Sequence, residues 1–159
     1  MQRKPIIGVI GASEATPAGY AAAREVGRHI AEAGAVLVCG GLTGVMEGVS
    51  LGCAEAGGLV LGILPGSEAG EANPYVSLPI PTNMGHARNV IIVHTAPVLI
   101  AVEGEFGTLS EMAVALKIGR PVIALNSRFK LEGVIEVSTP EEAVRLALAR
   151  HPRAQPEPR

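Results

Sequence analysis

Short apolar runs and longer amphipathic segments alternate along most of the chain. Five of the runs are apolar at nearly every position, which is typical of strands buried on both faces of a parallel sheet. These runs cover residues 5–10, 35–39, 59–64, 97–102 and 121–125. Residues 134–137 form a further expected strand. Residues 75–80 form an edge strand at most, because Pro79 and Pro81 cannot donate to a sheet.

Helical periodicity and capping residues occupy the segments between the runs. Thr16 before Pro17 predicts the N-cap and first residue of a helix that ends near Gly34. Thr139 before a proline predicts the start of a last helix. We therefore expect helices over residues 17–33, 45–56, 83–95, 107–118 and 140–150. The polar, Gly- and Pro-containing residues 67–74 are expected to form a mobile surface loop.

This alternation predicts the fold class: a single α/β domain with a Rossmann-like, doubly wound, mainly parallel sheet and helices on both faces. We place the domain at residues 1–150 and expect the Pro- and charge-rich residues 151–159 to be disordered. In such folds, ligands bind beyond the carboxyl ends of the strands. Three Gly-containing turns, after Ile10, Cys39 and Val102, lie at those ends.

Composition and charge exclude several classes of function. Apolar residues make up 48% of the chain, but no run is long enough to span a bilayer, so we expect no membrane partner. The net charge is −2 without a dense basic stripe, and aromatic residues are 3%, so we expect no nucleic-acid partner. The first residues lack a signal-peptide pattern, which predicts a cytoplasmic protein. No His or Cys spacing predicts a metal site.

The turn after Val102 is the main candidate for ligand chemistry. Gly104 and Gly107 bend the chain before an amphipathic helix, and the first amides of a helix are free to bind an anion. Any phosphate-bearing ligand should therefore contact Gly107 and Thr108. Ser13, in the turn after Ile10, is either a ligand donor or a plain turn residue.

Three motifs together carry a resemblance to a known family. They are Gly40-Gly41-Leu42-Thr43-Gly44-Val45-Met46, Asn83-Met84-Gly85-His86-Ala87-Arg88-Asn89, and Gly104–Glu111. The combination resembles the Lonely Guy-type phosphoribohydrolases, once labelled lysine decarboxylase-like, and their relatives the molybdenum-cofactor carrier proteins. The hydrolases cleave the N-glycosidic bond of a nucleoside 5′-monophosphate.

The resemblance implies roles for particular residues. Gly41, Gly44, Gly107 and Thr108 would hold a phosphate, and Ser13, Gly40, Thr43, Met46 and Gly104 complete the candidate ligand-binding set. Glu111 and Arg88 would act at the ribose, where a carboxylate stabilises positive charge on the sugar. We expect Arg88 to hold that carboxylate through charge-assisted hydrogen bonds.

Three residues depart from the hydrolase pattern. Glu103 and Glu105 replace a proline and a glycine of the hydrolase loop, and Asn89 replaces a lysine. Glu105 would bring a carboxylate beside the expected phosphate. Two unit charges ~5 Å apart cost about 3 kcal/mol at an effective dielectric constant of roughly 20. The sequence around Arg88 and Glu111 is more similar to the carrier-like branch, which is associated with a phosphorylated pterin cofactor.

Three functional hypotheses stay open. The first is a carrier-like protein that binds a small phosphorylated ligand, a nucleotide or a molybdopterin-type cofactor. The second is an active nucleoside 5′-monophosphate phosphoribohydrolase. The third is a regulatory or interaction protein with a decayed pocket, for which Glu105 is the best support.

Alternative roles also remain for single residues. Glu111 fits a capping box with Thr108, and His86 is more typical of a structural hydrogen-bonding residue than of a ligand contact. The apolar segment Ala87–Val93 exceeds what one face of a sheet requires. We therefore expect a homodimer or a higher homo-oligomer.

Overall fold

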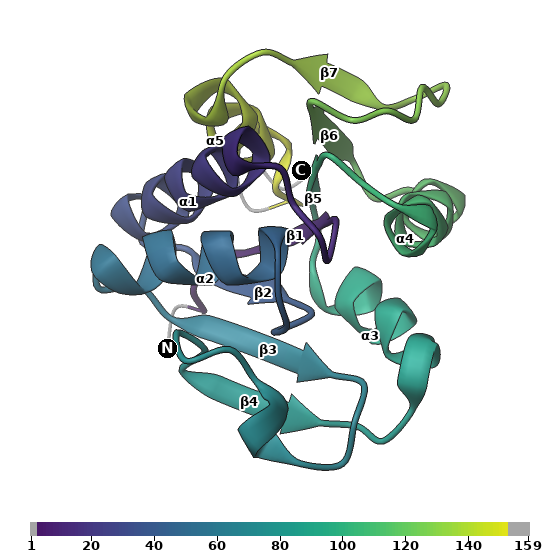
Figure 1. Cartoon of the computed structure of the whole chain (residues 1–159). Helices are drawn as coiled ribbons and strands as arrows, with labels where there is room; N and C mark the ends of the chain where they lie inside the picture. Colours follow the sequence, from purple (N-terminus) through teal and green to yellow (C-terminus); the bar gives the residue numbers. More distant parts are fainter. Residues whose placement is uncertain (1–2, 153–159) are drawn as a thin grey trace.

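One parallel sheet of seven strands forms the centre of the molecule (Figure 1). A computed structural model describes residues 3–152. The strand order of the sheet is β4-β3-β2-β1-β5-β6-β7. The strands are β1 (Ile6–Gly11), β2 (Val36–Cys39), β3 (Val60–Leu64), β4 (Leu78–Pro81), β5 (Leu99–Val102), β6 (Val122–Leu125) and β7 (Ile135–Val137). The order reverses between β1 and β5, which is where ligands bind in open sheets of this kind.

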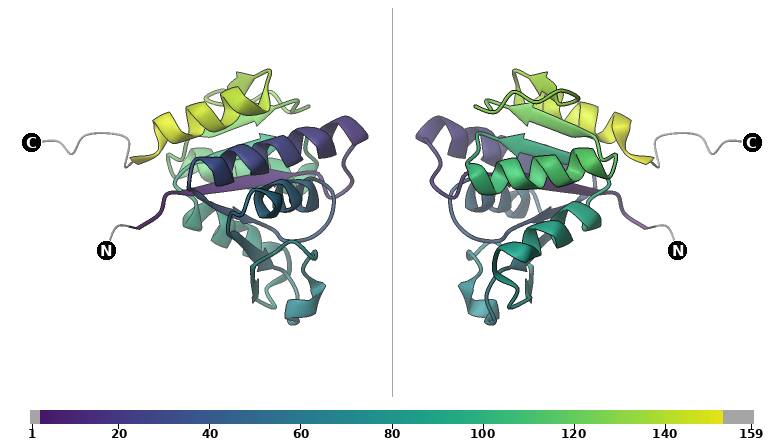
Figure 2. Two further views of the ribbon diagram at one scale, coloured as in Figure 1. Left: turned by 90° about the vertical axis from the view of Figure 1, so that its left-hand side faces the viewer. Right: turned by 90° about the vertical axis from the view of Figure 1, so that its right-hand side faces the viewer.

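Five α-helices cover both faces of the sheet, which confirms the predicted fold class. In Figures 1 and 2, α1 (Pro17–Glu32), α2 (Val45–Glu55) and α5 (Pro140–Arg150) lie on one face. The opposite face is covered by α3 (Arg88–Thr95) and α4 (Phe106–Lys117). Two short 3-10 helices, η1 (Ala69–Glu71) and η2 (Gly85–Ala87), lie in the connections on either side of β4. Within residues 3–152, no helix combines the length and apolar character needed to cross a membrane.

The core has two parts, one on each side of the sheet. Ala23 and Val26 of α1 and Val49 of α2 pack with strand side chains in the larger cluster. Ile92 of α3 and Met112 of α4 pack with the strand side chains that point to the other face. All four residues of β5, which lies between β1 and β6, are buried, as expected for a strand with helices on both sides.

Local capping signals place several helix ends where they were predicted. The Thr16 hydroxyl accepts a hydrogen bond from the Gly19 amide at 3.0 Å, and Thr139 accepts from the Glu142 amide at 3.2 Å. Gly34 follows α1 with a φ of +72°, a left-handed conformation that favours glycine. At the other end of α5, His151 is the C-cap and is buried. The rest of the predicted disordered tail, residues 153–159, lies outside the described residues.

One local prediction is wrong, and a second, the mobility of the loop 67–74, stays a prediction. Gly107 does not precede α4 but lies inside its first turn, because the helix begins at Phe106; only Gly104, with a φ of +139°, bends the backbone before it. The expected mobile loop 67–74 contains η1 and ends in Asn73, which is buried. The Asn73 side chain donates to the Leu42 carbonyl at 2.8 Å, so this end of the loop is attached to the second Gly turn.

Candidate functional site

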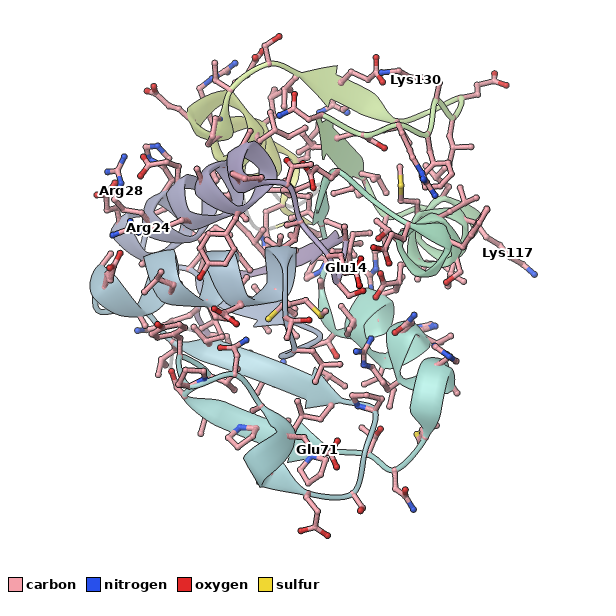
Figure 3. The ribbon with its side chains drawn as sticks, viewed as in Figure 1. Glu14, Arg24, Arg28, Glu71, Lys117 and Lys130 are labelled. Atoms are coloured by element: carbon pink, nitrogen blue, oxygen red, sulfur yellow. The ribbon has the colours of Figure 1, made fainter. Side chains whose placement is uncertain are left out.

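A cavity of about 390 Å³ opens at the carboxyl ends of the central strands. It lies where the strand order reverses, between the turn after β1, the turn after β2 and the N-terminus of α4. Figure 3 shows the labelled Glu14 on the loop after β1, near the centre of the view. A cavity of this size is within the usual range for small-molecule sites.

Seven of the predicted site residues line this cavity: Ser13, Gly40, Met46, Arg88, Gly107, Thr108 and Glu111. The turns that contain Gly40 and Gly107 therefore face one cavity, as the sequence predicted. The four other candidates, Gly41, Thr43, Gly44 and Gly104, are not among its lining residues.

Those four residues shape the turns instead. The Thr43 hydroxyl donates to the Ser13 carbonyl at 3.0 Å, which joins the turn after β2 to the turn after β1. A Cβ on Gly44 would lie 2.3 Å from the Ala12 carbonyl oxygen, and Gly44 has a φ of +66°. Both the close approach and the backbone conformation therefore require glycine there.

Arg88 is the cation of the site. It begins α3, only 8% of it is exposed, and its Nε has no hydrogen-bond partner. Its Nη1 donates to the Asn89 side-chain oxygen. A Cβ on Gly40 would lie 2.9 Å from Arg88 Nη2, so this glycine gives the guanidinium its space. Burial lowers the pKa of Arg88, and the nearby Glu111 raises it.

Glu111 is the buried acid of the site. It lies on α4, one turn beyond the helix start, and is 6% exposed. Burial raises its pKa from 4.5 to about 8, and the positive charge of Arg88 only partly opposes that shift. At pH 7 the side chain is therefore mostly protonated.

The expected Arg88–Glu111 hydrogen bond is not present. Among residues 3–152, no hydrogen bond and no ion pair within 4 Å joins the two side chains, although each affects the pKa of the other. The hydrogen bond that Arg88 does make to a side chain goes from its Nη1 to Asn89, the next residue along the chain. Arg88 and Glu111 thus line one cavity without neutralising each other.

Glu105, not Glu111, caps α4. Glu105 is the N-cap and forms a capping box with Thr108, whose hydroxyl accepts from the Glu105 amide at 3.3 Å. The alternative interpretation of Glu111 as a capping residue is therefore wrong. Glu105 also accepts hydrogen bonds from the Ser13 hydroxyl at 3.2 Å and from the Glu14 amide at 3.4 Å.

Glu103 also contacts the loop between β1 and α1, at a position closer to the start of α1. Its carboxylate accepts from the Thr16 amide at 3.2 Å and from the Thr16 hydroxyl. A Cβ on Gly19 would lie 2.2 Å from the Glu103 carboxylate, so this acid sits directly against the first turn of α1. Glu103 has a φ of +54°, which is uncommon for a residue other than glycine. The two acids that depart from the hydrolase pattern both bind the loop between β1 and α1.

Several lining residues were not in the predicted set: Leu42, Pro65, Gly85, His86, Asn89 and Glu105. Asn89, His86 and Glu105 belong to the motifs that carried the resemblance, so their positions could have been included on that ground. Leu42 and Gly85 also lie in those motifs, but they and Pro65 carry no polar side chain and gave no chemical signal. Among residues 3–152 there is no group of three His, Cys, Asp or Glu side chains that could hold a metal ion.

Fold and site together define a Rossmann-like protein with a small-ligand crevice at the switch point of its sheet. The chain belongs to the SLOG cluster4 family, whose model matches residues 4–155. This membership confirms the resemblance to the carrier-like branch of the Lonely Guy superfamily.

Two of the similar proteins with known structures are a molybdenum cofactor binding protein and a molybdenum cofactor carrier protein. The molybdenum cofactor binding protein from Rippkaea orientalis is 40% identical, with a TM-score of 0.89, and the match covers 94% of this chain and 98% of that one. The molybdenum cofactor carrier protein from Chlamydomonas reinhardtii is 34% identical, with a TM-score of 0.81 and coverage of 92% and 99%. An uncharacterized protein of Archaeoglobus fulgidus is 48% identical over 143 residues, which are 90% of this chain and 94% of the relative.

Proposed function

We propose that this protein binds a small phosphorylated ligand of the molybdopterin type in the cavity around Arg88 and acts as its carrier. The observation that carries the proposal is the state of Arg88: a buried guanidinium that lines the cavity and whose Nε lacks a hydrogen-bond partner. A buried, incompletely paired charge is costly, and a ligand phosphate would relieve that cost. The similarity to cofactor-binding and carrier proteins supports the same ligand class.

The neighbouring groups suit an anionic ligand. Arginine binds phosphate through two parallel hydrogen bonds, and the first turn of α4, with Gly107 and Thr108 at the cavity, favours negative charge. Glu111, mostly protonated at pH 7, adds little repulsion. Met46, Leu42 and Pro65 supply apolar walls for the rest of the ligand.

Calorimetric titration with molybdopterin, and with adenosine 5′-monophosphate as the nucleotide, tests this proposal. Arg88→Gln should weaken binding about tenfold or more, because charge-assisted hydrogen bonds contribute about 1.5–3 kcal/mol. Arg24→Gln is the matched control, because Arg24 lies on the surface and pairs with Glu55 (Figure 3). Absence of binding to both ligands would contradict the proposal and favour a protein with a decayed pocket.

A second candidate, nucleoside 5′-monophosphate hydrolysis, is favoured by one observation. Strongly shifted pKa values are typical of functional sites, and that of Glu111 is raised to about 8 inside the cavity. A protonated Glu111 would donate its proton to the departing base as the bond from the base to the sugar carbon breaks, water would add to that carbon, and the proton lost by the water would return to the Glu111 carboxylate. Release of free base from the monophosphate, lost in Glu111→Gln, would support this activity. Equal rates for the parent and Glu111→Gln would exclude a catalytic role for this residue.

A further inference from the structure

The anion-binding part of the cavity already holds an anion that belongs to the chain. Ser13 Oγ and the Glu14 amide, both on the loop after β1, donate to the carboxylate of Glu105. Glu105 is also the N-cap of α4, so its carboxylate lies at the positive end of that helix. A hydroxyl, a loop amide and a helix N-terminus are groups that would otherwise bind a phosphate.

A second observation supports an anionic ligand for the cavity. Arg88 is 8% exposed, lines the cavity with Glu105, and has an Nε without a partner. Among the lining residues, all of which belong to the described part of the chain, it is the only permanent cation. The cavity therefore combines one unsatisfied cation with one anion-binding position that a side chain already occupies.

We propose that Glu105 determines which ligands the cavity accepts, by admitting a single phosphate monoester and rejecting ligands with a second phosphate. This inference rests on the proposed function and specifies its ligand class. A single phosphate would bind to Arg88 and to the first turn of α4. A second phosphate would need the position at Ser13 and Glu14, where it would have to displace the Glu105 carboxylate or lie beside it. Displacement would cost the carboxylate its hydrogen bonds to Ser13 and Glu14, and repulsion between two anions at short range opposes the side-by-side arrangement.

Glu103 provides the matched control. It is the other acid on the same loop, two residues away, and it likewise binds the loop between β1 and α1. It is not among the residues that line the cavity around Arg88. Glu103→Gln and Glu105→Gln therefore remove the same charge from neighbouring positions, but only Glu105→Gln removes it from the cavity. Glutamine keeps hydrogen-bonding capacity, and thermal melting of each variant shows whether the loop stays folded.

The experiment measures the binding of inorganic phosphate and of pyrophosphate to the parent and to both variants. Amide chemical shifts of Glu14, Gly107 and Thr108 report the site of binding. The parent should bind pyrophosphate no more than about twofold tighter than phosphate. Glu105→Gln should bind pyrophosphate about tenfold tighter than the parent does, with a change below about threefold for phosphate. Glu103→Gln should resemble the parent.

Several results would overturn the inference. They are an equal gain in Glu103→Gln, an unchanged preference in Glu105→Gln, binding of pyrophosphate by the parent more than about twofold tighter than that of phosphate, and no pyrophosphate binding to any variant. The outcome is separable from that of the proposed function. Molybdopterin binding by the parent with an unchanged preference in Glu105→Gln would reject only the role of Glu105. If Glu105→Gln gains pyrophosphate binding but the parent does not bind molybdopterin, only molybdopterin as the ligand would be rejected.

Discussion

At the scale of single residues, the site is controlled by charges that burial separates from water. Arg88 and Glu111 are both buried in one cavity, yet no hydrogen bond joins them. The pKa of Arg88 is lowered and that of Glu111 is raised. Both shifts favour the neutral form of the side chain, because desolvation outweighs the attraction between the two groups. A ligand anion near Arg88 would add a favourable partner for the guanidinium.

Glu111 should give the folding stability a pH dependence. Its pKa is about 8 in the folded protein and 4.5 in its ordinary state, so folding favours the protonated form. Its contribution is therefore complete below about pH 4.5 and is lost as the pH rises toward about 8. Glu111→Gln, which cannot ionise, should be more stable than the parent at pH 8 by on the order of 4 kcal/mol and close to it in stability at pH 5.

Urea unfolding at the two pH values measures this difference. Glu132→Gln serves as the control, because Glu132 is exposed to water. A Glu111→Gln variant whose stability follows that of the parent across this pH range would show that Glu111 is not buried in its protonated form.

At the scale of elements, the Gly turns are positioned by two features: the close packing of helices, and hydrogen bonds between a surface loop and the turn after β2. Helices α1 and α2 approach each other through small residues, so that their backbones nearly touch. A Cβ on Gly27 would lie 2.0 Å from the Val49 carbonyl oxygen, and one on Gly52 would lie 1.8 Å from that of Arg24. These are contacts with backbone atoms, which cannot move aside cheaply.

Gly52→Ala should therefore destabilise the fold by about 2 kcal/mol, since overpacking at a close contact typically costs about 1–3 kcal/mol. The midpoint of urea unfolding would measure the loss. Gly70→Ala is the comparison, because a Cβ at Gly70 would meet no atom within 4 Å. Similar midpoints for the two variants would mean that α1 and α2 can separate without cost.

Asn73 connects a surface loop to the turn after β2. Its side chain donates to the Leu42 carbonyl, and its amide donates to the Gly41 carbonyl at 2.8 Å. Asn73→Ala leaves the Leu42 carbonyl without this donor and should cost about 1–3 kcal/mol of stability. Because Gly40 and Leu42 line the cavity, we also expect weaker binding of the phosphorylated ligand.

Ser67→Ala is the control for the Asn73 prediction. Ser67 lies in the same loop, but its hydroxyl bonds only the adjacent Glu68. Unfolding and calorimetric titration of both variants would separate the two positions. An Asn73→Ala variant that matches Ser67→Ala in both measurements would show that the loop does not position the turn.

At the scale of the whole molecule, apolar side chains stay exposed on one side of α3 and on the edge strand β4. Val90 of α3 is 43% exposed, Met84 before it is 50% exposed, and Leu78 and Ile80 of β4 are also exposed. Other side chains of α3, such as Ile92 and Val93, are buried against the sheet. Val90 on α3 and Met84 just before it are therefore apolar residues that their own domain does not cover.

We expect this side to form the contact of a homodimer. Light scattering at micromolar concentration should give about twice the monomer mass, and Val90→Glu should shift it toward the monomer. Leu59→Glu is the control, because Leu59 is also exposed but lies before β3, at the opposite end of that strand from the cavity. A monomeric parent protein would contradict the prediction.

The strands, the helices and the Gly-rich turns could be predicted from the sequence because they depend on neighbouring residues. Apolar runs marked every strand of the sheet's interior to within about two residues, and Thr16 and Thr139 marked helix starts through contacts three residues away. The motifs around Gly40, Arg88 and Glu111 also identified one cavity correctly, because carboxyl ends of parallel strands meet at one edge of the sheet.

Only the tertiary structure decided the electrostatics of the site. Glu105 binds Ser13, 92 residues away, and Glu103 binds Thr16, 87 residues away. The high pKa of Glu111 and the unpaired Nε of Arg88 depend on how completely the surrounding elements exclude water. Charge interactions depend on distance and burial, and both are set by the packing of segments that are far apart along the chain.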